Sequence, residues 1–327
     1  MNRVLVTGGT GFIGANLCAA LVARGDSVRV LKRPTSDTRL LNGLPVGFCD
    51  GDLRNPSEVR AAVAGCGTVY HTAAVVSFLR TRYEEQCRVN IEGTRAVVDA
   101  CLAAGVHTLV HTSSIAALGY PAEGELATEE TPFVDGGRSG YARSKRMAEE
   151  EILKGVAGGL HAVIVNPSVV VGERDVHFHG GEVLRQSSKG RLLASIRGGM
   201  NIVCVGDVVR GLIAAAEKGR CGERYILCGE NLTHREIFTL AARITGRRPP
   251  LVELPVPVLT SVARCAEMIC TVTGIPAVLS PDLVAGAGRF NWFSCGKAAR
   301  ELGYSFTSCA TALETAYRWY LAEGLLT

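Results

Sequence analysis

The chain has 327 residues, of which 47% are hydrophobic and 20% are charged, and its formal net charge is +4. This composition is typical of a globular protein that buries a sizeable core, and it excludes an intrinsically disordered chain. Because no block of lysines and arginines stands out beyond Arg247-Arg248, we expect no nucleic-acid partner.

The first residues lead directly into a predicted strand, without the charged and apolar regions of a signal peptide. The 12 cysteines are scattered and form no C-x-x-C pair, which favours reduced thiols over a zinc site or a disulfide framework. The most apolar stretch, residues 255–279, is interrupted by Arg264, Glu267 and several prolines, so it predicts packed helix and loop rather than a membrane span. We therefore expect a cytoplasmic protein.

The chain opens with a predicted strand, glycine turn and helix. Residues 3–7 are apolar and rich in β-branched side chains, residues 8–14 read Gly-Gly-Thr-Gly-Phe-Ile-Gly, and residues 15–24 are apolar and rich in alanine. In this setting the glycines allow a tight turn, let backbone amides approach a pyrophosphate, and let the helix pack on the strand. The N–H groups and the positive dipole end of the helix attract the phosphates. The pattern predicts a dinucleotide-binding site.

The second predicted strand, residues 27–31, ends at Lys32-Arg33. An NAD enzyme carries an acidic residue about 20 residues past the glycines, where it binds the ribose 2′-hydroxyl. Arg33 stands at that place and suits a 2′-phosphate, although it would also serve as a solvated strand end. We therefore favour NADP(H) as the cofactor and keep NAD(H) as the alternative.

Strands and helices continue to alternate through the first half of the chain. Further strands are predicted at residues 46–51, 68–71, 107–112 and 160–165, and helices at 83–104 and 141–154. This alternation predicts an α/β fold with a Rossmann-type, doubly wound parallel sheet.

The pattern loosens from residue 172, where glycines are frequent and suggest a mobile lid. Helices are still predicted at residues 182–188, 207–218, 234–245 and 310–323. We expect an NADP-binding Rossmann domain over residues 1–171, to which part of 200–228 returns, and a smaller, mixed substrate-binding lobe formed mainly by residues 172–327.

Tyr141 and Lys145 form a Y-x-x-x-K motif on a predicted helix, so their side chains lie one turn apart on one face. An ammonium beside a phenol favours the phenolate and lowers a pKa that is ordinarily near 10. Ser113-Ser114 follow a predicted strand, and ligands of such sheets bind at the carboxyl ends of the strands. Together these residues predict an acid–base site.

The two motifs, with segments 51–53, 71–74, 90–94 and 112–114, resemble the extended short-chain dehydrogenase/reductases of the NAD-dependent epimerase/dehydratase family. Residues 33–36 and 165–168 are similar to two groups within it, the dihydroflavonol-4-reductase-like carbonyl reductases and the bacterial hopanoid-associated sugar epimerases. Segments 223–227 and 299–304 extend the resemblance over nearly the whole chain. One departure is Leu118, where sugar-nucleotide epimerases often carry a tyrosine, and this weakens the sugar interpretation.

The resemblance implies three catalytic residues. Tyr141 is the general acid/base, and Lys145 is its pKa partner and the anchor of the nicotinamide ribose. Ser114 orients the substrate oxygen; it is preferred to Ser113 because it stands five residues before Gly119, as the family's serine does.

The resemblance also implies contacts with the cofactor. Asp52 and Leu53 flank the adenine, Ala73 lies by the phosphate and ribose, and Pro167 covers the nicotinamide side. The full set of expected cofactor-binding residues is Gly8, Thr10, Gly11, Phe12, Ile13, Gly14, Arg33, Asp52, Leu53, Ala73, Asn90, Tyr141, Lys145 and Pro167. The family further implies a homodimer formed through helices 83–104 and 141–154.

No metal is predicted, because His177 and His179 have no carboxylate or cysteine companions at ligand spacing.

Our main hypothesis is an NADP(H)-dependent oxidoreductase that reduces a small-molecule ketone or aldehyde. The alternatives are an NAD(P)-dependent nucleotide-sugar epimerase or dehydratase and, from another class, an NADP(H) sensor without chemistry.

Overall fold

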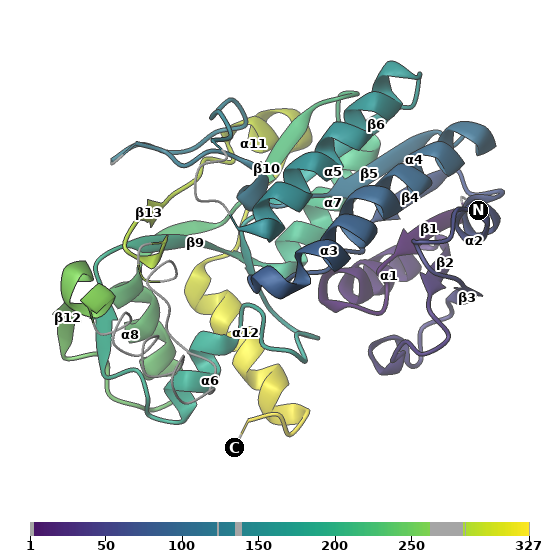
Figure 1. Cartoon of the computed structure of the whole chain (residues 1–327). Coiled ribbons are helices and arrows are strands. Elements are labelled where there is room, and N and C mark those ends of the chain that lie inside the picture. Colours follow the sequence, from purple (N-terminus) through teal and green to yellow (C-terminus); the bar gives the residue numbers. More distant parts are fainter. Residues whose placement is uncertain (1–2, 123, 135–138, 262–283, 285, 327) are drawn as a thin grey trace.

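The structure is a computed structural model that describes residues 3–122, 124–134, 139–261, 284 and 286–326. Most of the apolar segment 255–279, for which packed helix and loop were predicted, lies outside these residues. Figure 1 shows two parts, a sheet covered by helices and a second lobe built from the later half of the chain.

The first part is organised by a seven-stranded sheet in which every neighbouring pair is parallel. The spatial order is β10-β6-β5-β4-β1-β2-β3, so the winding direction reverses between β1 and β4. This confirms the predicted Rossmann-type, doubly wound fold. The strands are β1 (Arg3–Thr7), β2 (Ser27–Lys32), β3 (Gly47–Asp50), β4 (Thr68–His71), β5 (Thr108–Thr112), β6 (Ala162–Pro167) and β10 (Arg224–Leu227).

Helices cover both faces because alternate residues of each strand point to opposite sides. Val4 and Val6 of β1 belong to one buried cluster and Leu5 to the other. The first face carries α1 (Phe12–Arg24), α7 (Val205–Lys218) and α11 (Gly296–Leu302), and the second α2 (Pro56–Val63), α4 (Gly93–Ala104) and α5 (Gly140–Ala157). Of these, α2 was not predicted, although Asn55-Pro56 is a helix-start signal and the Asn55 side chain accepts from Ser57 N at 3.2 Å.

The helix predicted over residues 83–104 is interrupted. It consists of α3 (Tyr83–Gln86), a π-helical turn η3 (Cys87–Glu92) and α4. The wider turn contains Asn90, which is buried. Such turns commonly occur at functional sites, and this one directs a polar side chain toward the sheet edge where ligands are expected. Shorter 3₁₀ segments are η1 (Arg39–Leu41), η2 (Arg80–Arg82) and η4 (Ile115–Ala117).

The second lobe has a mixed sheet, in which β9 (Gly199–Cys204) pairs antiparallel with β11 (Glu230–Thr233) and parallel with β7 (Val169–Val171) and β13 (Phe290–Asn291). A separate parallel pair joins β8 (Ala194–Ile196) to β12 (Val252–Leu254). Its helices are α6 (Glu182–Ser188), α8 (His234–Ile244) and α12 (Cys309–Ala322). A capping box between Thr233 and Glu236 fixes the start of α8, and Tyr320 of α12 lies fully buried in the core of the lobe.

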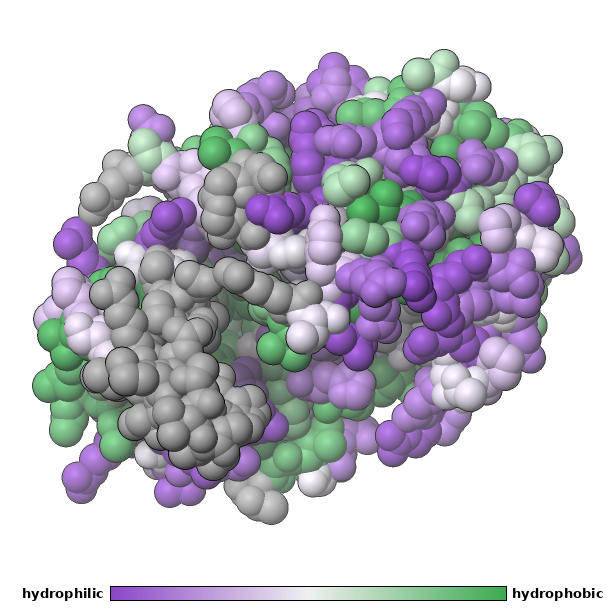
Figure 2. All heavy atoms as spheres, in the orientation of Figure 1, coloured by the Kyte–Doolittle hydropathy of each residue, from purple (hydrophilic) through white to green (hydrophobic). Residues whose placement is uncertain are grey.

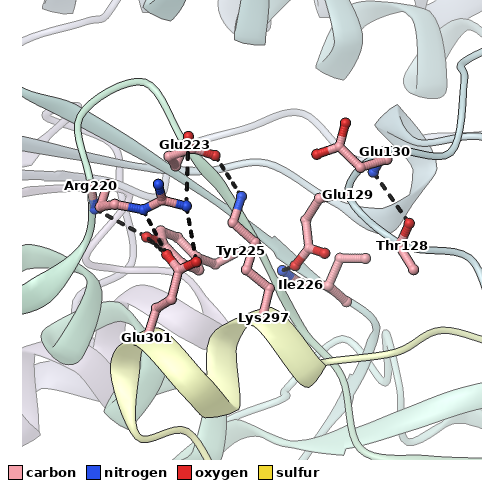
Figure 3. A network of polar contacts seen from close by, with 9 residues as sticks. All are labelled: Thr128, Glu129, Glu130, Arg220, Glu223, Tyr225, Ile226, Lys297 and Glu301. Carbon is pink, nitrogen blue, oxygen red and sulfur yellow. Dashed lines mark hydrogen bonds and ion pairs between the residues drawn. The ribbon is translucent and has the colours of Figure 1, made fainter.

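The edge strand β10 is tied down by polar contacts (Figure 3). The Ile226 N–H, which an edge strand would leave unpaired, donates to the Glu129 carboxylate at 2.8 Å. Arg220 donates twice to Glu301 of α11, at 2.9 Å each, and Lys297 of α11 pairs with Glu223 at 2.6 Å. These contacts attach the late helix α11 to the sheet and cover its edge.

The surface differs between the two parts. In the orientation of Figure 1, hydrophilic residues cover much of the first part, whereas hydrophobic ones gather at the rim of the second lobe near β12 (Figure 2). Leu251 and Val252 are exposed at this rim. Among the described helices, none combines the length and the apolar character that crossing a membrane requires.

Candidate functional site

Two glycines of the turn pack too closely against backbone atoms to carry a side chain. Gly8 has φ +71°, and a Cβ there would lie 2.6 Å from the backbone of Ala73, in the loop after β4. A Cβ on Gly14 would overlap the Gly8 carbonyl oxygen, so this glycine lets α1 start directly against the strand. Thr7 and Ala73 are also joined by a weak hydrogen bond from Ala73 N to Thr7 Oγ1 at 3.4 Å.

Gly11 has a different surrounding. It is the exposed N-cap of α1, and a Cβ there would meet only the Gly8 oxygen, at 3.3 Å. No side chain caps the helix, and its first turn carries no acidic residue. The N–H groups of residues Phe12 and Ile13 therefore begin α1 beside open space, which is the geometry that a dinucleotide pyrophosphate needs. The glycine cradle fits the cofactor predicted from the sequence.

The expected adenosine side lies at the ends of β2 and β3. Arg33 is exposed, and its backbone turns through hydrogen bonds with Ser36 at 2.9 and 3.2 Å, whereas Lys32 pairs with Asp50. Of the two neighbouring cations, Lys32 thus forms an ion pair, whereas Arg33 forms none among the described residues. The Asp52 carboxylate is held by Arg54, and that hydrogen bond, against the effect of burial, lowers its pKa.

Leu53 and Asn90, two of the expected cofactor-binding residues, direct their side chains to other parts of the protein. Leu53 is buried and packs against Gly93 of α4. Asn90 accepts from Val75 N at 2.8 Å and donates to Val75 O at 3.1 Å and to Ser144 Oγ at 2.9 Å. Its side chain is fully used in joining the loop after β4 to α5, so it positions residues near Ala73 rather than pointing to a ligand.

Tyr141 lies in the first turn of α5, whose N-cap Ser139 accepts from Ala142 N at 3.2 Å. Its hydroxyl lies beside the side chain of Ser114, which follows β5. Ser113 instead donates to buried Glu149 at 2.6 Å. The two serines therefore have separate surroundings, and Ser114 is the one placed at the tyrosine hydroxyl. Pro167, the last residue of β6, is buried nearby in the sheet.

Lys145 is almost completely buried, and its ammonium donates to Thr112 O at 2.7 Å. Burial lowers the pKa of Lys145 to about 8, with the Glu149 charge opposing that shift. Burial likewise raises the pKa of Tyr141, while the neighbouring Ser114 side chain acts in the opposite direction. The lowered Tyr141 pKa expected from the sequence is therefore absent, because desolvation outweighs the favourable contact and the lysine is directed to a carbonyl.

Two histidines, not predicted as site residues, lie beneath Lys145. His71 is held between Thr7 Oγ1 at 2.7 Å and Thr94 Oγ1 at 2.9 Å, and its ring lies 5.2 Å from that of His111. Burial, then the Lys145 charge, lowers the pKa of His71 to about 3 and that of His111 well below its usual range. Both rings are neutral at neutral pH, so the ammonium is the only cation in this layer of the described site.

A second feature that the sequence did not reveal is the buried carboxylate of Glu149. It accepts from Ser113 and from Asn166 at 2.7 Å, and from Arg224 of β10 at 2.7 Å. Asn166 also donates to Ser114 O at 3.0 Å. The i+4 spacing of residues 141, 145 and 149 was the available signal, because it places all three on one face of α5.

An exposed aromatic side chain contacts the catalytic candidate Tyr141. The Phe78 ring contacts that of Tyr141 edge-on, with 5.8 Å between centroids, and remains 71% exposed. Its loop is held by Gln86, which donates to Ser77 O at 2.6 Å. Within the described residues, no three His, Cys, Asp or Glu side chains come together so as to hold a metal ion.

Known proteins are similar in sequence to this chain over nearly its whole length. The NAD dependent epimerase/dehydratase family matches residues 4–228. Sterol demethylase protein B of Methylococcus capsulatus is 33% identical, over 98% of this chain and 99% of its own length. A Synechocystis protein provisionally named dihydroflavonol 4-reductase is also 33% identical, over 98% of this chain and 94% of its own.

Solved structures agree with the fold. The crystal structure of gox2253 has a TM-score of 0.89 and 35% identity, and the similarity covers 100% of both chains. The UDP-glucose 4-epimerase of Thermus thermophilus, solved in complex with NAD, has a TM-score of 0.77 and 26% identity, covering 98% of this chain and 99% of that one.

Replacing two glycines of the turn by alanine tests their roles in stability and in phosphate binding separately. Gly14→Ala forces a backbone clash and should lower the free energy of unfolding by about 2 kcal/mol or more, measured by urea denaturation. Gly11→Ala fits its backbone and should leave stability within about 1 kcal/mol, yet weaken NAD(P)H binding in fluorescence titrations, because its methyl group fills the cradle. Wild-type affinity in Gly11→Ala would show that the phosphates do not approach there.

The buried Lys145 should make stability depend on pH. Its folded pKa of about 8 lies below the unfolded value, so the unfolded state binds more protons between these values and stability rises with pH there. The free energy of unfolding of the wild type, minus that of Lys145→Met, should rise by about 2 kcal/mol from about pH 7.5 to about pH 9.5. A pH-independent difference in urea denaturation would mean that the ammonium is not desolvated.

Proposed function

The chain belongs to the NAD dependent epimerase/dehydratase family and is an NAD(P)-dependent oxidoreductase, and from this premise we propose that it reduces a ketone or aldehyde with NADP(H). The observation that carries the proposal is the Tyr141 hydroxyl, which lies beside Ser114 at the carboxyl edge of the sheet, with Lys145 one turn away. When bound, the nicotinamide supplies the hydride.

The side chains divide the acid–base work. The raised pKa of Tyr141 keeps the phenol protonated at neutral pH, so it can donate a proton to the substrate oxygen as the alcohol forms. Ser114 orients and polarises that oxygen. Lys145 anchors the ribose and stabilises the phenolate that remains, since an ammonium interacts strongly with an anion in a dry site.

The surroundings of Tyr141 support an apolar ketone over a nucleotide sugar. Val76, Phe78 and Leu79 are exposed on the loop beside it, at 48, 71 and 68%. Apolar walls with few polar groups are typical of sites for hydrophobic ligands. The relatives named for sterol demethylation and dihydroflavonol reduction are consistent with this choice.

The cofactor preference rests on the exposed Arg33, at the position where an acidic residue would select NAD. We further propose that the enzyme is cytoplasmic and forms a homodimer through α3–α4 and α5.

The nucleotide-sugar epimerase remains the second candidate function because the Thermus enzyme, of similar fold, is one. The sensor alternative is disfavoured by the presence of both Tyr141 and Lys145.

Replacing Tyr141 tests the proposed chemistry. In steady-state assays that follow NADPH oxidation with a panel of apolar ketones, Tyr141→Phe should lose about 10²- to 10⁴-fold in kcat, because the proton donor is gone. NADPH binding should be unchanged. The control is Tyr317→Phe on α12, which removes a hydroxyl in the second lobe and should retain full activity. If Tyr141→Phe kept its rate, the proposal would fail.

Replacing Arg33 tests the cofactor. Arg33→Gln should raise the Kd of NADPH about 10- to 100-fold and leave that of NADH unchanged, because it removes a charged contact with the 2′-phosphate. The control is Arg39→Gln, which removes an exposed arginine that is already paired with Asp37.

The nucleotide held by the purified protein separates the two candidate functions. A reductase exchanges its cofactor in each turnover, whereas an epimerase returns the hydride to its substrate and can retain the nucleotide. Stoichiometric NAD released on denaturation, together with turnover of a nucleotide sugar, would contradict the proposal of an NADP(H)-dependent reductase.

A further inference from the structure

The second lobe reaches the first turns of α1 through a short segment after β7. Asn16 of α1 donates to Phe12 O and to Glu173 O, each at 2.9 Å. In return, Arg174 Nη1 donates to Asn16 Oδ1 at 3.0 Å. The side chain of Arg174 is 28% exposed, and among the described residues it forms a long ion pair with the Glu173 carboxylate at 4.0 Å.

This segment is rigidly built. The fully buried Asp175 accepts from the backbone N–H groups of His179, Gly180 and Gly181 at 2.9, 3.0 and 3.2 Å, and from Tyr320 Oη at 3.1 Å. Phe178 stacks on Tyr320 with 4.5 Å between centroids. The glycines here serve close packing, since a Cβ on Gly181 would overlap the Tyr320 hydroxyl.

Arg174 itself is held in a costly conformation. Its φ is +67°, in the left-handed region, where a residue with a Cβ is strained by about 1 kcal/mol or more. A glycine would avoid that strain. The anchored turn therefore holds a long cationic side chain at a position where the backbone alone would favour glycine.

The guanidinium contacts α1 one turn from its N-terminus, where the phosphates are expected. Asn16 is four residues past Phe12, so Arg174 meets α1 about 6 Å along its axis from the open N-terminus. The first turn of α1 offers backbone N–H groups but neither acidic nor basic side chains to a doubly charged pyrophosphate. An arginine fits this ligand well, because its planar donors match phosphate oxygens and its charge is permanent.

We infer that Arg174 binds the pyrophosphate of the dinucleotide, so that the second lobe contributes a cofactor ligand through a turn fixed by Asp175 and Tyr320. This inference rests on the cofactor site of the proposed function and extends it to a residue outside the Rossmann domain. Because both NADPH and NADH carry the pyrophosphate, Arg174 contributes to the affinity of each, whereas Arg33 contributes to that of NADPH alone.

The test compares nucleotide binding with stability in the full chain. Arg174→Gln, which can keep the contact with Asn16, should raise the Kd of NADPH and of NADH alike by about tenfold in fluorescence titrations. Arg174→Gly should weaken both similarly while retaining or raising the melting temperature of the nucleotide-free protein, because the strain is relieved. Arg185→Gln is the matched control: it removes an arginine over Phe178 that pairs with Glu182, and should leave both Kd values unchanged.

Two results would overturn the inference. Unchanged Kd values with a lower melting temperature in Arg174→Gln would make the residue a structural link between the lobes. A loss confined to NADPH would place it at the 2′-phosphate instead. If both nucleotides bind and depend equally on Arg174 but no ketone is reduced, the inference stands and the proposed function fails.

Discussion

The buried ammonium of Lys145 is the constraint around which the site is arranged. A charge removed from water costs several kcal/mol unless polar groups replace its hydration, and here the replacement is one carbonyl, Thr112 O, with the Glu149 carboxylate one turn further along α5. The two neutral histidines below add no competing charge. The pKa of Lys145 is lowered because the Glu149 charge and the carbonyl do not fully offset the free-energy cost of desolvating the ammonium. A ribose bound to the lysine would supply further hydrogen-bond partners, so cofactor binding and stability are coupled at this residue.

Glu149 extends the same constraint to the late part of the chain. A buried carboxylate needs partners at both oxygens, and it takes them from β5, β6 and β10 through Ser113, Asn166 and Arg224. The network thereby fixes β10 and, through Asn166, the backbone at Ser114. Polar contacts on the outer side of β10 then attach α11. The serine that faces Tyr141 is consequently positioned by residues more than a hundred positions apart in the sequence.

The parts that the sequence could predict are those that depend on local pattern. Strand–turn–helix order and the regular alternation of strands and helices specify the sheet, because each element is set by its own residues and by short connections. The spacing of Tyr141 and Lys145 likewise indicates a shared helical face. The pKa of Tyr141 could not be inferred from that spacing, because it depends on how much water is excluded by Phe78 and the strands. The π-helical turn that redirects Asn90 was also beyond reach, since its helical pattern is continuous in the sequence.

Arg174 illustrates why site residues that come from a distant part of the chain are hard to predict from the sequence. Nothing in its neighbours marks it as a phosphate ligand, and the glycines around it suggest mobility. Only the packed lobe shows that Asp175, Phe178 and Tyr320 determine the turn strongly enough to hold a residue with φ +67°. The glycine cradle binds through backbone groups and therefore needs a characteristic local sequence, whereas a side chain delivered from another lobe needs only a rigid support. Residues of the first kind are visible as motifs; those of the second kind become visible as strain that the surrounding packing maintains.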